Sequence, residues 1–311
     1  MKQEFTFLSA DGITRIHAVQ WKPEGEIKAV LQLCHGMVEY IDRYDAFAKS
    51  LNQQGICVIG HDHLGHGLSV NIEEDYGYFH HSKGNEIVIA DIRRLFLYIE
   101  KKFPHIPHFM LGHSMGSFLL RQYIQEYPEN IHGAIIMGTG YHNKAECILG
   151  IGACFILQLI KGDHYRSAFV NQMAFGGYNA RFKPSRTDYD WLTRDEQIID
   201  AYQSHPWCTF IFTVNAYMHM LRGILSLTDK KKRQNISRDM PMLFISGEDD
   251  PVGGFGKGVK KVYKQFQKLH MTDLSLKLYP KGRHEILNEI NRLDVFSDIG
   301  NWLEVRIHHK K

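Results

Sequence analysis

The chain has 311 residues, of which 44% are hydrophobic and 23% are charged, and its formal net charge is +3. These values are ordinary for a globular protein and predict one large domain, or one domain that carries an insertion. So slight an excess of positive charge argues against nucleic acid as a partner.

Five cysteines are scattered along the chain without metal-type or redox-type spacing: Cys34, Cys57, Cys147, Cys154 and Cys208. An odd number of cysteines, several within apolar runs, favours free thiols and a reducing compartment. The first residues lack an apolar core of signal-peptide length, and the longest apolar run, residues 147–160, is too short to span a bilayer. We therefore expect a cytoplasmic protein, with peripheral membrane contact as an option; the sequence gives no expectation of an oligomeric state.

Strand and helix patterns alternate along most of the chain. The expected strands are residues 5–8, 13–21, 29–34, 56–59, 109–111, 133–137, 242–245 and 274–279. The expected helices are residues 44–54, 85–103, a helix from Ser114 to about 127, and two near 259–269 and 295–303. Such alternation predicts an α/β fold with a mostly parallel sheet that helices cover on both faces.

The alternation stops at about Gly140 and returns at about residue 236. Between them the sequence has helical and aromatic pieces but no buried-strand pattern. We therefore predict a core formed by residues 1–140 and 236–311, with residues 141–235 as a helical cap over the C-terminal edge of the sheet.

One short stretch carries a motif with a chemical meaning. Ser114 lies between Gly112 and Gly116, directly after an apolar strand pattern and before a helical one. A Gly-x-Ser-x-Gly bend of this kind strains the serine backbone and exposes its hydroxyl above the sheet. Ser114 is therefore a candidate nucleophile.

A serine nucleophile needs a base, and the base needs an acid that orients it. On this architecture both are expected after later strands, the acid first. Acids at 248–250 follow the strand at 242–245, and His284 follows the strand at 274–279. The residue types and their order therefore predict a Ser–acid–His triad.

These motifs resemble the α/β-hydrolases of the monoacylglycerol lipase and lysophospholipase group, which includes serine aminopeptidase-like sequences. The resemblance covers nearly the whole chain in element order. It selects Asp250 as the acid, because the family's acid lies three residues after the glycine at the strand end, here Gly247. It also places the family histidine at His284, and it implies ester hydrolysis without a metal or an organic cofactor.

An oxyanion hole requires two backbone N–H groups, one of them from the residue after the nucleophile, Met115. The other is expected after the third strand, where the family motif is matched by His35, Gly36, Glu39, Arg43 and Tyr44. The resemblance assigns the second N–H to Met37. Val38 stands where the family often has glycine.

Substrate contacts are expected around this centre. The candidate substrate-binding residues are Glu39, Arg43, His113, Ile151, Phe155 and Tyr217. Glu39 and Arg43 are four residues apart, so an ordinary surface ion pair is the alternative to a headgroup pocket. Residues 148–160 are either a helix packed between cap and core or a lid with a lipid-facing side and an acyl tunnel. Lys230–Arg233 is expected to be a solvent-exposed segment where the chain leaves the cap. Contact with anionic lipid headgroups is the less favoured alternative.

Parts of the sequence are compatible with other functions. The histidines and Asp62 of the stretch 61–67 suggest metal ligands, although the family uses Asp62, Gly65 and Gly67 as a structural turn. A peptidase would need an acid for the substrate ammonium, with Glu146, Asp163 and Asp188 as candidates. A thioesterase would use the same triad, whereas a binding module would leave it idle. The preferred hypothesis is a serine hydrolase of acyl-lipid esters, either monoacylglycerols or lysophospholipids.

Overall fold

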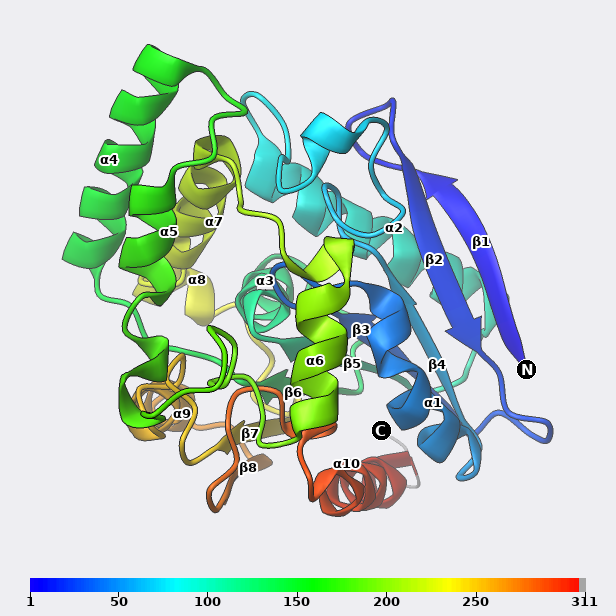
Figure 1. The fold of residues 1–311 in the computed structure, drawn as a ribbon. Helices are drawn as coiled ribbons and strands as arrows, with labels where there is room; N and C mark the ends of the chain where they lie inside the picture. Colours follow the sequence, from blue (N-terminus) through cyan, green and yellow to red (C-terminus); the bar gives the residue numbers. More distant parts are fainter. Residues whose placement is uncertain (308–311) are drawn as a thin grey trace.

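The computed structural model describes residues 1–307 and contains one eight-stranded sheet (Figure 1). The strands are β1 (Lys2–Leu8), β2 (Arg15–Trp21), β3 (Ala29–Cys34), β4 (Ile56–His61), β5 (His108–His113), β6 (Gly133–Met137), β7 (Met242–Gly247) and β8 (Leu274–Tyr279). Their order is β1-β2-β4-β3-β5-β6-β7-β8, and every pair from β4 onward in that order is parallel. The prediction of a mostly parallel α/β-hydrolase sheet is confirmed.

Helices cover both faces of this sheet. The apolar side chains of α1 (Asp45–Asn52) and α10 (Arg292–Ile307) pack in one core cluster, and those of α2 (Gly84–Lys102), α3 (Met115–Glu126) and α9 (Lys257–Gln267) pack on the opposite face. The central strands β3 to β7 are buried along their whole length, as expected where helices lie on both sides.

The predicted elements match the structure closely, with differences at their ends. The helix expected at residues 44–54 is α1, which runs from Asp45 to Asn52, and a 3₁₀ turn, Ile41–Tyr44, precedes it. Within the segment 141–235, the helix Val214–Ser226 begins where the Thr213 side chain accepts a hydrogen bond from the Ala216 N–H and caps it.

The chain between β6 and β7 is helical throughout its regular structure. It contains α4 (Lys144–Lys161), α5 (Ala168–Phe175), α6 (Glu196–Ser204), α7 (Val214–Ser226) and α8 (Lys230–Arg233). In Figure 1, α4, α5 and α7 lie together at the left, whereas α6 lies apart from them, in front of the central strands. Because β3, β5, β6, β7 and β8 are parallel, their carboxyl ends share one edge, where the loops after β3, β5, β7 and β8 meet.

No helix among residues 1–307 has the length and apolar character that crossing a bilayer requires.

Candidate active site

Ser114 occupies a strained turn between β5 and α3. Its backbone has φ 52° and ψ −119°, a conformation that is costly for a residue with a side chain. A Cβ at Gly116 would collide with the Cys34 and His35 carbonyl oxygens, and one at Gly112 would collide with the Gly116 carbonyl. The two glycines are therefore required by close backbone contacts, as the motif predicted.

His284 and Asp250 form a buried pair beside this turn. The Nδ1–H of His284 donates to Asp250 Oδ1 over 2.9 Å, and both side chains are almost fully buried. Asp250 also accepts the Ser246 hydroxyl at 3.0 Å and the Val252 N–H at 2.9 Å. Burial alone would raise the pKa of Asp250, but His284 and these two donors lower it, so the carboxyl is ionised.

Ser114 and His284 line the same cavity. The Ser114 hydroxyl has no hydrogen-bond partner among the described residues, whereas the Ser114 N–H donates to the Met137 carbonyl over 3.0 Å and fixes the turn to β6. The backbone bond thus helps to hold the Ser114 side chain at the cavity.

The loop after β3 is shaped by a histidine that faces its own backbone. Nδ1–H of His35 donates to the Gly36 carbonyl over 2.7 Å, while His35 Nε2 accepts the His63 N–H at 2.9 Å. A trans peptide directs its C=O and N–H to opposite sides, so this bond turns the Met37 N–H away from His35. A Cβ on Gly36 would lie 3.0 Å from the Ser114 Cβ, which places this peptide next to the serine.

Val38, in the same loop, has a φ of 54°. A β-branched residue is strained in this left-handed region, which explains why glycine suits the position. The Tyr202 hydroxyl of α6 donates to the Val38 carbonyl over 3.0 Å and helps to hold the turn.

Glu39 and Arg43 belong to a buried charge network, so an ordinary surface ion pair does not describe them. Glu39 is 3% exposed and accepts from Arg43 at 3.0 Å and from the ring Nδ1 of His113 at 3.0 Å. It also accepts from the Tyr44 hydroxyl and the Gly36 N–H. Arg43 in turn donates both guanidinium arms to Glu285, at 2.7 and 2.6 Å. The loops after β3 and β8 are thereby joined by charge-assisted bonds.

His113 faces acceptors on both sides of its ring. Its Nδ1 lies against Glu39, and its Nε2 lies 3.4 Å from the His284 carbonyl oxygen. Burial would lower the pKa of His113, but Glu39 raises it above the ordinary value, and the pKa of Glu39 is lowered in return. Both shifts favour an imidazolium–carboxylate pair directly behind the serine.

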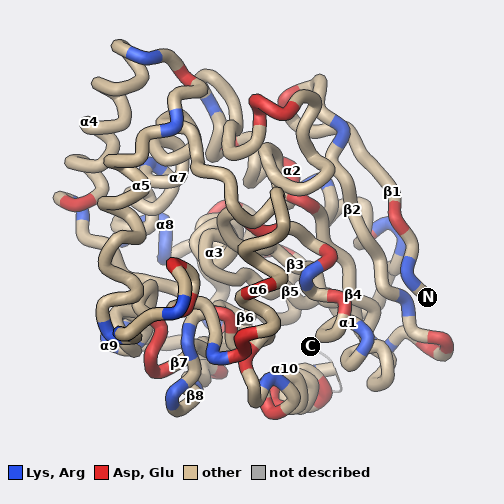
Figure 2. The backbone as a smooth tube through the Cα atoms, in the orientation of Figure 1, with Lys and Arg blue, Asp and Glu red and all other residues tan. Residues whose placement is uncertain are grey.

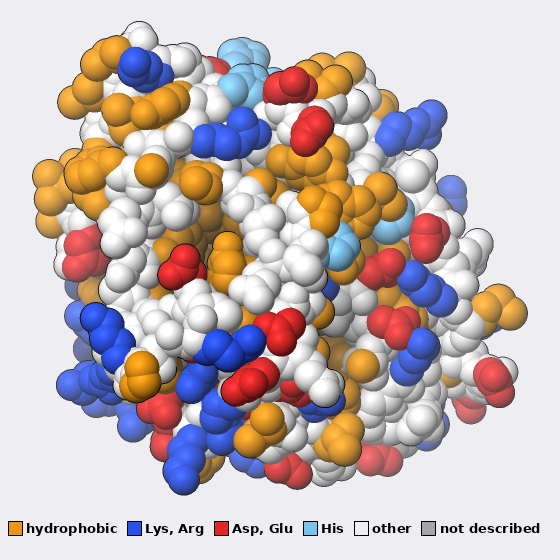
Figure 3. Space-filling view, viewed as in Figure 1, with side chains coloured by type: hydrophobic (Ala, Val, Ile, Leu, Met, Phe, Trp, Pro, Cys, Tyr) orange, Lys and Arg blue, Asp and Glu red, His pale blue; other side chains and the backbone are white. Residues whose placement is uncertain are grey.

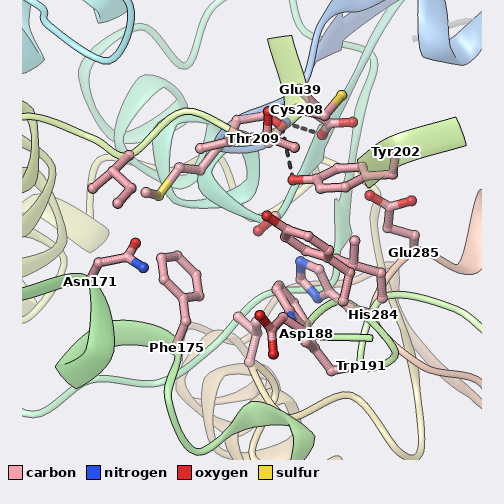
Figure 4. A pocket seen from close by; sticks show the side chains of 18 of the residues that line it. Glu39, Asn171, Phe175, Asp188, Trp191, Tyr202, Cys208, Thr209, His284 and Glu285 are labelled. Atoms are coloured by element: carbon pink, nitrogen blue, oxygen red, sulfur yellow. Dashed lines mark hydrogen bonds between the residues drawn. The ribbon is translucent and has the colours of Figure 1, made fainter. Parts of the chain in front are cut away.

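Two cavities of opposite character meet at Ser114. One, of about 360 Å³, has mainly polar and aromatic walls that include Glu39, His113, Asp188, Trp191 and Glu285. Figure 4 shows this polar cavity, with Phe175, Trp191 and Tyr202 around it.

The other cavity, of about 310 Å³, is bounded by helices α4, α5 and α7 and by the first turn of α3. We call it the apolar cavity, since its walls are formed mainly by Met115, Phe118, Cys147, Gly150, Cys154, Val170, Met173, Ala174, Phe175, Tyr178, Tyr217, Met220, Leu221 and Ile224. Met37 and Ser114 border this cavity as well.

The predicted substrate residues fall at different places. Glu39 and His113 line the polar cavity, Tyr217 lines the apolar one, and Arg43 lies behind Glu39. Ile151 and Phe155 line neither cavity. The face of α4 that borders the apolar cavity carries Cys147, Gly150 and Cys154, because those positions are one helical turn apart, whereas Phe155 is 47% exposed.

The three acids considered for binding a substrate ammonium also lie at different places. Asp188 lines the polar cavity, and Glu146 borders the apolar cavity while capping α4 together with Asn143. Asp163 lines neither and accepts from Gln158 at 2.7 Å.

Sequence reasoning missed Glu285 and Trp191. Glu285 follows His284 directly, but nothing in the sequence linked it to Arg43. The Trp191 ring lies 5.2 Å from the His284 ring, and the Trp191 carbonyl accepts the His284 N–H at 3.3 Å.

Asp62 organises a turn. It accepts the Ile41 N–H at 2.7 Å, the Leu68 N–H at 3.0 Å and the His17 ring at 2.9 Å, and a Cβ on Gly67 would collide with its carboxylate. Within residues 1–307, no group of three or more His, Cys, Asp or Glu side chains is arranged to hold a metal ion.

The outer face of α4 is apolar and uncovered. The exposed large apolar side chains on α4 and α5 are Ile148, Leu149, Phe155, Ile156, Leu159, Ile160, Phe169 and Met173. Figure 3 shows hydrophobic side chains gathered over these helices, and Figure 2 shows charged residues only toward the ends of α4. Three lysines of Lys230–Arg233 are exposed, whereas Arg233 is buried and donates to the Leu227 carbonyl.

A parallel sheet with a serine on a strained strand–helix turn, and a histidine–carboxylate pair beside it, defines a serine hydrolase of the α/β-hydrolase class. The family model described as serine aminopeptidase, S33, matches residues 25–291. The chain belongs to this family, in agreement with the resemblance seen in its motifs.

Several known proteins of similar sequence are named as lipases. The chain is 24% identical to a monoacylglycerol lipase of Mycolicibacterium smegmatis over 97% of both chains. It is 25% identical to a monoglyceride lipase of Rattus norvegicus, over 92% of this chain and 86% of that one. Among solved structures, a carboxyl esterase from Bacillus coagulans in complex with glycerol has a TM-score of 0.90 at 24% identity, covering 98% of this chain and 99% of the esterase.

Proposed function

We propose that this protein hydrolyses the ester bond of monoacylglycerols, with Ser114 as nucleophile, His284 as general base and Asp250 as the acid that orients the imidazole. The observation that carries the proposal is the position of Ser114 where an apolar and a polar cavity meet. An acyl chain suits the first cavity and a hydroxylated leaving group suits the second.

The reaction proceeds through an acyl-enzyme. The Ser114 oxygen attacks the ester carbonyl while His284 Nε2 takes its proton, and His284 then protonates the leaving alcohol. Water, activated by the same histidine, releases the fatty acid. Asp250 holds Nδ1–H and stabilises the imidazolium that forms, a role supported by the 2.9 Å bond between them.

The Met37 and Met115 N–H groups serve as the oxyanion hole. Met115 is the first residue of α3, where backbone N–H groups have no partner within the helix and the helix dipole favours negative charge. The bond from His35 to the Gly36 carbonyl supports Met37 as the second donor, because it turns the Met37 N–H away from His35.

The polar cavity favours an uncharged headgroup over a phosphate. No Lys or Arg side chain among the described residues lines it, whereas Glu39, Asp188 and Glu285 do. A lysophospholipid would place its phosphate near these carboxylates without a cationic partner, which is unfavourable. Monoacylglycerols avoid this cost.

Residues 141–235 form the cap in this proposal, and the outer face of α4 and α5 contacts the lipid surface that delivers substrate. The exposed Leu149, Leu159 and Ile160 are typical of an interfacial helix. The protein is then cytoplasmic and peripheral at membranes, in keeping with its five free, buried cysteines.

Cleavage of aminoacyl amides by the same triad is the second candidate. It is favoured by Asp188, an exposed carboxylate at the polar cavity that has no hydrogen-bond or ion-pair partner among the described residues. The apolar cavity, however, suits a long acyl chain better than an amino acid bearing a free ammonium.

The test combines a substrate panel with one variant. The wild type should hydrolyse 1-monoacylglycerols faster than lysophospholipids and aminoacyl amides of matched size, and a fluorophosphonate probe should label it. Ser114→Ala should lose labelling and lower kcat/KM by about 10⁴-fold or more while circular dichroism stays unchanged. Retained turnover in that variant, or faster cleavage of amides than of esters, would refute the proposal.

A further inference from the structure

The charges around the polar cavity do not balance. Glu39 is matched by His113 and Arg43, and Glu285 is matched by the other side of Arg43. Asp250 is bonded to His284, and Asp188, an exposed side chain at the cavity, has no cationic partner among residues 1–307. The cavity therefore carries an excess of negative charge, with Asp188 as its unpaired carboxylate.

Aromatic rings line the same cavity. Phe175, Tyr189 and Trp191 are in its walls, and the Phe175 and Trp191 ring centroids lie 6.0 Å apart with planes inclined by 24°. Tyr202 also lines the cavity, but the Arg43 guanidinium already lies over its ring at 4.9 Å. Figure 4 shows the Asp188 side chain at the cavity together with Phe175, Trp191 and Tyr202. Ring faces next to an unpaired carboxylate attract an organic cation, above all a quaternary ammonium, which is weakly hydrated.

We propose that the polar cavity binds the cation of an amino-alcohol ester, so that long-chain acylcholines are a second substrate class. The proposal rests on the proposed ester hydrolysis at Ser114 and extends it to a charged leaving group. It differs from lysophospholipid hydrolysis because an acylcholine carries the cation without a phosphate.

The geometry suits such a leaving group. The choline oxygen must lie at His284 to receive its proton, and the trimethylammonium is two carbons further on. The Trp191 and His284 ring centroids lie 5.2 Å apart. A trimethylammonium two carbons beyond a choline oxygen at His284 therefore reaches the aromatic walls.

The reaction balances without any co-reactant other than water. The Ser114 oxygen forms a bond to the acyl carbon, and the acyl–oxygen bond to choline breaks. Choline leaves with the proton from His284, and water then converts the acyl-enzyme into fatty acid and free Ser114.

The experiment compares two esters of one shape. Lauroylcholine and 3,3-dimethylbutyl laurate have the same shape and differ in a charged nitrogen that replaces a carbon. Because the ammonium also makes choline a better leaving group, the change in the ratio of their kcat/KM values on substitution of Asp188 is what reports the cation site. Below micelle-forming concentrations, the wild type should prefer lauroylcholine by about five- to tenfold, the size expected for a partly exposed cation site. Asp188→Asn should reduce this ratio by about threefold, and Asp188→Lys should reverse the preference.

The matched control is Asp239→Asn. Asp239 is an exposed carboxylate just before β7, at the opposite edge of the sheet, so its removal changes the net charge equally but should leave the ratio as it is. A wild-type ratio at or below one, with both 1-monolauroylglycerol and 3,3-dimethylbutyl laurate hydrolysed, would overturn the cation site alone. Failure to cleave any of the three esters would instead overturn the proposed ester hydrolysis.

Discussion

The edge of the sheet and the helical segment 141–235 contribute to the site in different ways. At the edge, polar atoms fix one another: Asp250 has three hydrogen-bond donors, and Glu39 joins four groups. The segment contributes mainly walls, such as Val170, Ala174 and Met220 around the apolar cavity. Hydrogen-bond geometry tolerates little change, whereas an apolar wall can change shape and remain apolar.

This difference indicates a division of labour. Substitutions at the edge should change how fast any ester is cleaved, and substitutions in the segment should change which ester is preferred. The two regions meet where the Trp191 and Leu192 carbonyls accept the His284 and Glu285 N–H groups, so the division is sharp only away from that contact.

The largest effect on selectivity is expected at Ala174. A phenylalanine there would fill part of the apolar cavity of about 310 Å³. Ala174→Phe should lower kcat/KM for palmitoyl esters by about a hundredfold and for acetyl esters by about twofold or less, because only the long chain needs the filled volume. Steady-state rates on p-nitrophenyl esters of both lengths measure this.

The control for that variant is Ala145→Phe, an exposed position on α4 that lines neither cavity. It should leave the ratio of long-chain to short-chain rates unaltered. Equal losses on both esters in Ala174→Phe would mean that the helical segment acts on turnover as well, and the division of labour would fail.

The outer face of the same segment supplies the next prediction. Leu149 and Leu159 are 74% and 70% exposed, and their joint replacement by serine should weaken binding to phosphatidylcholine vesicles by about 30-fold, or about 2 kcal/mol. Leu293→Ser on α10 is the matched control, because Leu293 is 73% exposed on another helix. Sedimentation with vesicles gives the partition coefficients, and equal binding by the double variant and the control would remove the lipid-facing role.

Local sequence patterns predicted the fold, because the apolar residues of each core strand or helix recur with one spacing over several positions. The bounds of β3 and β6 agree with the predicted residues, since buried parallel strands leave continuous apolar runs between turns. The bounds of β8 agree as well, although this half-buried edge strand shows alternation of apolar and polar residues instead. The order of Ser114, Asp250 and His284 was readable for a related reason: parallel strands bring their carboxyl ends to one edge whatever their separation in the chain.

The walls of the cavities were not predictable in the same way. Residues 148–160 are apolar on nearly every side, so periodicity could not tell the face with Gly150 and Cys154 from the face with Phe155. The bond between Arg43 and Glu285 joins positions 242 residues apart and depends on the final path of two loops. No local signal reports such a contact.

That contact allows a test of the edge itself. Glu285→Gln keeps the shape but removes the charge that holds both arms of Arg43, so the loop that carries His284 should be less well positioned. We expect kcat to fall by about tenfold on long and short esters alike, with KM little changed. Asp298→Asn, which removes the ion pair with Lys277 but keeps an acceptor for the Tyr279 hydroxyl, is the control and should not change kcat. A loss confined to one chain length would contradict a positioning role.

The smallest effect on activity is expected at the far end of β5. His108 is 3% exposed and stacks on Phe96, with ring centroids 4.2 Å apart, and neither of its ring nitrogens has a hydrogen-bond partner among the described residues. Burial lowers the pKa of His108 to about 3. Between pH 6.5 and about 3 the unfolded chain therefore binds a proton that the folded chain does not, so this residue's contribution to stability is lost as the pH falls through that window.

His108→Phe removes the imidazole and keeps a ring in its place. The variant should be more stable than the wild type at every pH, by about 1–3 kcal/mol at pH 8 and by a larger margin at pH 5. At pH 5 the burial that keeps His108 neutral lowers the free energy of unfolding of the wild type. Because His108 lies at the opposite end of β5 from Ser114, kcat/KM on either ester should stay the same. Urea unfolding at the two pH values measures the margins. A stability difference that shrinks toward pH 5 would show that the His108 ring is protonated in the folded protein. A change in ester selectivity would show that residues outside the segment 141–235 also determine which ester is preferred.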